Sequence, residues 1–98
     1  KPPKYPSTSR DIAMVVSEST PVAEIEKVIK EAGTEILRSV KLFDIYRGIQ
    51  VGPGKKSVAY SLTYRHDDRT LTDVETEEAH AKVVEALKNN LGASIRDN

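Results

Sequence analysis

The spacing of the apolar residues alternates between strand-like and helix-like periods, and this order constrains the fold more than any other feature of the chain. Apolar residues recur at every second position over 10–16, 35–48 and 55–65, and at helical spacing over 22–32 and 73–91. A short run, ASIR, follows as a last strand. We therefore predict an α+β fold of ferredoxin-like order β-α-β-β-α-β, with a four-stranded antiparallel sheet and two helices on one face.

Capping and turn residues mark the ends of these elements. Thr20 is predicted to cap the first helix, and Gly33 to end it in the left-handed conformation. TDVE predicts a capping box between Thr72 and Glu75, and Gly92 is placed to end the second helix. VGPG predicts a turn between the second and third strands.

The length of 98 residues suits one domain with one core. We expect that domain over residues 10–98, after an extended or linker segment, rich in proline and serine, at 1–9. The chain contains no cysteine, which excludes disulfide frameworks and thiolate zinc sites and fits a reducing cytoplasm. It has no apolar run approaching roughly 18 residues, so no membrane contact is expected.

The net charge of zero is a sum of unlike segments. Residues 38–69 hold seven basic and three acidic residues, a net of +4. Residues 21–36 carry a net of −2 and residues 70–92 a net of −3. A domain with this distribution can present one positive face although it is neutral as a whole.

Alternation divides each strand into a core side and a side that faces away from the helices, here called the open face. The expected core positions are Ile12, Met14, Val16, Phe43, Ile45, Val58, Tyr60, Leu62 and Tyr64. The open face would then carry Ala13, Val15, Leu42, Asp44, Tyr46, Ser57, Ala59, Ser61, Thr63 and Arg65. If the hairpin closes about VGPG, Tyr46 lies opposite Ser57 and Asp44 lies opposite Ala59.

This face suits an unpaired nucleobase. Small residues surround the ring of Tyr46, and stacking of a base on such a ring is worth roughly 1–3 kcal/mol. The carboxylate of Asp44 can accept from N–H groups on a guanine edge, beside the hydroxyl of Ser57. The basic residues expected at the rim to meet phosphates are Arg47, Lys55, Lys56, Arg65 and Arg69.

Other functions find weaker support in the residues. Exposed tyrosines are common in strands, so a ferredoxin-like domain that binds a protein or a small ligand, without RNA, remains an alternative. A metal-binding regulator is disfavoured because cysteine is absent and the two histidines, His66 and His80, lie far apart. We expect no metal site and no catalysis by the chain itself, since it lacks a P-loop and a nucleophile–base pair.

Five short motifs, in this order and spacing, resemble a known family: YPSTSRDIAMVV, FDIYRG, GKKSVAYSLTYR, RTLTD and LGASIR. Together they are similar to the ferredoxin-fold anticodon-binding domain that ends the β subunit of bacterial phenylalanyl-tRNA synthetases. The resemblance runs from about Tyr5 to Arg96. It implies the fold already predicted and a domain that binds the anticodon stem-loop of the phenylalanine tRNA.

The resemblance also implies roles for single residues. Tyr46 would stack on the first anticodon base, a guanine, while Asp44 and Ser57 form hydrogen bonds with it and Ala13 lines the same spot. Arg10 is a further candidate for a phosphate contact.

The resemblance further implies a cytoplasmic parent enzyme, an (αβ)₂ assembly in which the α subunit uses ATP and Mg²⁺. This domain would need no cofactor, would contact the rest of the β subunit and the α subunit, and would be monomeric when isolated.

Overall fold

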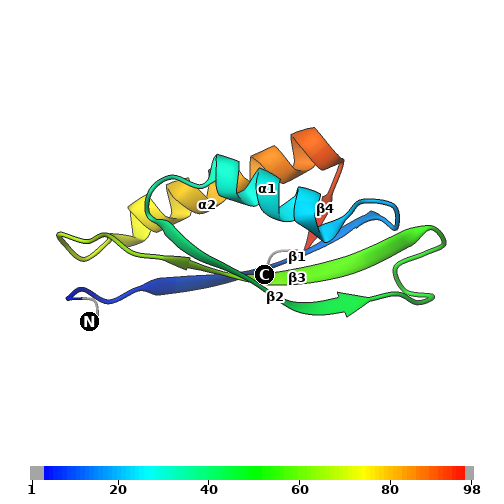
Figure 1. The fold of residues 1–98 in the computed structure, drawn as a ribbon, viewed down its shortest axis with the longest axis horizontal. Helices are drawn as coiled ribbons and strands as arrows, with labels where there is room; N and C mark the ends of the chain where they lie inside the picture. Colours follow the sequence, from blue (N-terminus) through cyan, green and yellow to red (C-terminus); the bar gives the residue numbers. More distant parts are fainter. Residues whose placement is uncertain (1–3, 97–98) are drawn as a thin grey trace.

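A computed structural model describes residues 4–96 of the chain (Figure 1). The elements are β1 (Thr8–Ser17), α1 (Val22–Ala32), β2 (Leu37–Tyr46), β3 (Lys55–Tyr64), α2 (Asp73–Leu91) and β4 (Ser94–Arg96). This is the β-α-β-β-α-β order that the sequence predicts. Residues 1–3 of the predicted entry segment and residues 97–98 of the predicted domain lie outside the described residues.

The four strands form one antiparallel sheet in the order β2-β3-β1-β4, so β1 and β3 are central. Figure 1 shows both helices on one face of this sheet, and neither helix of residues 4–96 covers the other face. The arrangement is the ferredoxin-like sandwich expected from the sequence. No helix within residues 4–96 is both long and apolar enough to cross a bilayer.

The core lies between the two central strands and the helices. Its strand residues are those that alternation assigns to β1 and β3, all at most 2% exposed: Ile12, Met14, Val16, Val58, Tyr60, Leu62 and Tyr64. The helices contribute Ile25, Ile29, Ala79, Val83 and Leu87. Each large apolar side chain buried in this way stabilises the fold by about 1.5–3 kcal/mol.

The second helix begins and ends as predicted. The Oγ1 of Thr72 accepts from the amide of Glu75, and the carboxylate of Glu75 accepts from the amide of Thr72, which completes the capping box. Gly92 has φ 62°, in the left-handed region that favours glycine.

The first helix differs from the prediction at both ends. Thr20 is not its cap: the residue at the N-cap is Pro21, whose carbonyl accepts from the amides of Glu24 and Ile25 and which has no side-chain hydrogen bond to offer. Gly33 is not left-handed but extended, at φ −68° and ψ 143°. It is needed for space instead, since a Cβ at position 33 would lie 2.2 Å from Cδ2 of Leu37.

Two irregularities in β2 change which residues share a face. The register with β3 shifts between Leu37 and Ser39, and again between Leu42 and Asp44. Leu42 consequently pairs with the buried Tyr60 and lies on the helix face, although strict alternation places it on the open face.

Phe43, expected in the core, is 58% exposed and has no partner in β3. Ile45, also expected in the core, lies opposite the buried Val58 but is 39% exposed at the edge of the sheet. A β-bulge breaks the period of two, which is why strand alternation fails at Leu42 and Phe43.

Candidate nucleic-acid interface

Tyr46 ends β2 at the hairpin, opposite Ser57 as predicted. Its side chain is exposed (42%), and its hydroxyl donates to Oε1 of Gln50 at 2.8 Å. The ring passes close to Gly48, where a Cβ would lie 2.4 Å from the hydroxyl oxygen. The ring is therefore held over the start of the hairpin loop, with solvent access for a stacking partner.

Asp44 belongs to a row of residues that crosses the open face from edge to edge. It lies opposite Ala59, which lies opposite Ala13, which in turn lies opposite Arg96 of β4. Directly opposed residues project from the same face of a sheet. The register thus brings Asp44 and Ala13 into one row, next to the row that holds Tyr46 and Ser57.

The six basic residues predicted to contact phosphates lie in different parts of the structure. Arg10 pairs with the buried Leu62, so it projects to the helix face, where it forms an ion pair with Glu77 of α2 at 2.7 Å. Lys56 lies opposite Val16 on the same face and is 6% exposed. Neither cation is on the open face.

Arg47 and Lys55 flank the hairpin. Nε and Nη2 of Arg47 donate to the two carboxylate oxygens of Glu18 at 2.5 and 3.0 Å. The hydrogen bond from Arg47 lowers the pKa of Glu18 below its ordinary value. Lys55 is exposed opposite Ser17 and forms no ion pair within residues 4–96.

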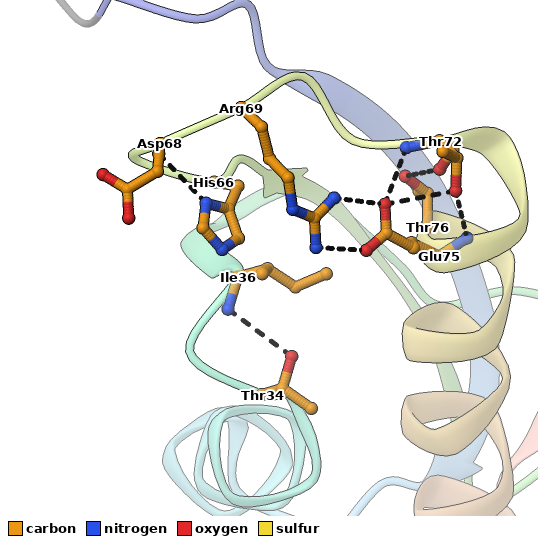
Figure 2. A network of polar contacts seen from close by, with 8 residues as sticks. All are labelled: Thr34, Ile36, His66, Asp68, Arg69, Thr72, Glu75 and Thr76. Atoms are coloured by element: carbon orange, nitrogen blue, oxygen red, sulfur yellow. Dashed lines mark hydrogen bonds and ion pairs between the residues drawn. The ribbon is translucent and has the colours of Figure 1, made fainter.

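Arg65 and Arg69 lie at the other end of the sheet, at the loop between β3 and α2. Nη1 of Arg65 donates to Asp67 at 2.9 Å. Figure 2 shows the guanidinium of Arg69 directed at Glu75, so it reinforces the capping box of α2. Hydrogen bonds from Arg69 and from the Thr72 amide lower the pKa of Glu75 to about 2.

His66, Asp67 and Asp68 lie together in the loop between β3 and α2. Nδ1 of His66 accepts from the amide of Asp68 at 3.0 Å, and the Asp68 carboxylate points away from the imidazole (Figure 2). Within residues 4–96, no three histidine or acidic residues come together in a way that would hold a metal ion.

Three residues lie on the open face although they were not predicted there. Arg96 and Lys41 are cations there, opposite Ala13 and Ser61 respectively, and Phe43 is an aromatic that lines the same face. The apolar Ile95 of β4 pairs with the buried Met14, and this alternation is the signal that could have placed Arg96 on the open face. Nothing in the sequence marks the bulges that place Lys41 and Phe43.

The open face therefore carries the groups that an unpaired base requires: an exposed ring, a carboxylate, hydroxyls, small residues that leave room, and two cations. The ion pair between Arg47 and Glu18 is exposed to solvent and therefore weak, so an approaching phosphate can compete for the Arg47 guanidinium.

Known proteins resemble nearly the whole chain. The model of the family described as "Ferredoxin-fold anticodon binding domain" matches residues 3–96. The phenylalanine–tRNA ligase beta subunit of Clostridium tetani is 51% identical over 94 residues, which are 96% of this chain and 12% of that protein. The beta subunits of Moorella thermoacetica and Bacillus subtilis, with the same coverage of both chains, are 50% and 47% identical. The chain thus spans about an eighth of the length of these relatives.

Proposed function

Because the chain belongs to the ferredoxin-fold anticodon binding domain family, we propose that its open face binds the anticodon stem-loop of the phenylalanine tRNA. The relatives at about half identity are phenylalanine–tRNA ligase beta subunits, which supports the choice of this tRNA. The observation that carries the proposal is the register of the open face, which sets the exposed ring of Tyr46 beside Ser57 and Asp44.

In this proposal the first anticodon base, a guanine, stacks on Tyr46. The Asp44 carboxylate accepts from two N–H groups on the guanine edge, while the Ser57 hydroxyl donates to or accepts from the base. Ala59 and Ala13 have no side chain beyond Cβ and leave the space above the sheet free. Adenine presents one donor, its exocyclic amine, beside a ring-nitrogen acceptor, so the carboxylate would lose one of its two hydrogen bonds.

The phosphates of the loop would meet cations at the edges of the open face. Arg96 on β4 and Lys41 on β2 project from this face, and Lys55 and Arg47 flank the hairpin beside Tyr46. Of the residues predicted from sequence, Arg10, Lys56, Arg65 and Arg69 lie elsewhere, and in this proposal they support the fold instead.

The domain is proposed as a non-catalytic part of a longer, cytoplasmic β subunit. Aminoacylation with ATP and Mg²⁺ would take place in the α subunit of an (αβ)₂ enzyme, and this domain would need no cofactor. Its task would be to hold the anticodon while the acceptor end of the tRNA reaches the catalytic subunit.

Fluorescence anisotropy with a labelled anticodon stem-loop tests the proposal. Tyr46→Ala should weaken binding by roughly 5- to 140-fold, and Tyr46→Phe, which keeps the ring, should weaken it far less. Asp44→Asn should reduce the preference for guanine over adenine at the first position.

Affinity should also fall steeply with salt, since phosphate contacts release counterions. If the affinity does not change with salt and is unchanged in Tyr46→Ala, the alternative is favoured, namely a ferredoxin-like domain that binds a protein or a small ligand.

A further inference from the structure

Phe43 is the second aromatic residue of the open face. The register of β2 moves from Leu42 opposite Tyr60 directly to Asp44 opposite Ala59, so Phe43 is the extra residue of a bulge. Both residues of a bulge oppose one residue of the neighbouring strand, and the bulge re-aims their side chains. Phe43 is 58% exposed and contributes nothing to the core cluster.

Phe43 forms one wall of a cavity of about 490 Å³ on the open face. Ala13 and Ala59 line the cavity between the strands, and Arg96, Asp11 and Ser9 line it on the side of β1 and β4. Its volume lies within the range of about 300–1,000 Å³ that is usual for ligand pockets. The small side chains leave a flat space beside the Phe43 ring.

This cavity is separate from the ring of Tyr46. Tyr46 does not line it, and the Tyr46 hydroxyl donates to Gln50 in the hairpin loop. Asp44 lies between the two aromatic residues in the sequence. The bulge thus provides two stacking surfaces, one at the hairpin and one near the middle of the sheet.

We propose that the Phe43 cavity receives a second anticodon base, next to the base stacked on Tyr46. This inference rests on the proposed function. Proteins that bind single-stranded nucleic acid stack successive bases on successive aromatic side chains, and four-stranded sheets take two or three bases in this way.

The polar groups of the cavity can form hydrogen bonds with the edge of a base. The guanidinium of Arg96 can only donate, whereas the carboxylate of Asp11 accepts. A base that presents a ring-nitrogen acceptor beside an exocyclic amine, such as adenine or cytosine, matches this pair.

The test compares stem-loops in which the base is removed at each anticodon position in turn. Phe43→Ala should weaken binding of the intact loop by roughly 5- to 140-fold, and Phe43→Tyr should retain affinity. Phe43→Leu fills the site without a ring and should behave like Phe43→Ala. The loss caused by Phe43→Ala should vanish at one missing base, and the loss caused by Tyr46→Ala should vanish at a different one.

The outcomes separate the two proposals. If the wild-type chain binds the loop and Tyr46→Ala weakens binding while Phe43→Ala does not, the second base site is wrong and the proposed function stands. The second base site is also wrong if Phe43→Ala causes an equal loss on every loop. If the wild-type chain binds no stem-loop, the proposed function fails, and the second site fails with it.

Discussion

The hydroxyl of Tyr46 lies so close to Gly48 that a Cβ at position 48 would stand 2.4 Å from it. The same hydroxyl donates to Gln50, so the loop fixes the direction of the ring from two sides. Gly48 has no left-handed φ, and its backbone does not need glycine. What requires glycine here is the space that the tyrosine ring occupies.

Gly48→Ala should therefore displace the ring of Tyr46 and weaken binding of the anticodon stem-loop, approaching the roughly 5- to 140-fold loss expected for Tyr46→Ala. Anisotropy titration measures the loss, and circular dichroism should show an unchanged fold. In a Tyr46→Ala background the same glycine substitution should have no further effect. An equal loss in both backgrounds would mean that Gly48 acts independently of the ring.

Phe43→Ala should have little effect on folding. Because the ring is 58% exposed, we expect a loss below about 1 kcal/mol in the free energy of unfolding. Leu62→Ala is the matched control, since Leu62 is fully buried and should cost about 2–5 kcal/mol. Urea denaturation gives both values. If the two variants lose similar free energies of unfolding, Phe43 must be a core residue after all.

The position of Phe43, predicted in the core but exposed on the open face, shows which part of the fold the sequence does not predict. The central strands β1 and β3 keep a strict period of two, and their core and open faces are as predicted. The pairing of Tyr46 with Ser57 is also as predicted, because both bulges of β2 lie further from the hairpin loop than this pair. The edge strand β2 carries two bulges that no local sequence pattern indicates, and the predicted core and open faces of β2 are therefore partly wrong.

Ion pairs were equally hidden from the sequence. Arg10, Arg65 and Arg69 meet partners 67, 2 and 6 residues away, and only the folded chain determines whether a cation faces the sheet or the helices. The role of Gly33 was also hidden. A glycine after a helix predicts a left-handed residue, but position 33 requires glycine because a side chain there would clash with Leu37.

Gly33→Ala should destabilise the domain by about 1–3 kcal/mol, because the added Cβ would meet Cδ2 and Cβ of Leu37 at 2.2 and 2.9 Å. Thermal or urea unfolding measures the change. Leu37→Ala removes the nearest atoms, so adding Gly33→Ala to that variant should cost less than it does in the wild type. Additive losses would show that the clash with Leu37 is not the cause.

The lowered pKa of Glu75 in the capping box should make the stability of the folded chain depend on pH. The pKa of Glu75 is lowered from an ordinary value of 4.5 to about 2, chiefly by the hydrogen bond from Arg69. Between these two values the unfolded chain binds more protons than the folded chain, so stability falls as the pH falls. The contribution is complete above pH 4.5 and is lost as the pH falls toward 2.

Melting temperatures of the wild type and of Glu75→Gln test this dependence. The wild type should be more stable at pH 7, and the difference should shrink between pH 4.5 and 2. Glu85→Gln serves as the control, since Glu85 forms no side-chain hydrogen bond within residues 4–96 and its replacement should give no such trend. A difference between wild type and Glu75→Gln that stays constant with pH would contradict the ion-pair account.

The central claim is that the open face of the sheet binds the anticodon, and an NMR titration of the labelled chain with the phenylalanine-tRNA anticodon stem-loop tests it most directly. We expect amide shifts centred on four residues of β1, β2 and β3, namely Ala13, Asp44, Tyr46 and Ser57, and we expect them to fade as salt is raised. Shifts confined to α1 and α2, or none at low salt, would contradict the account.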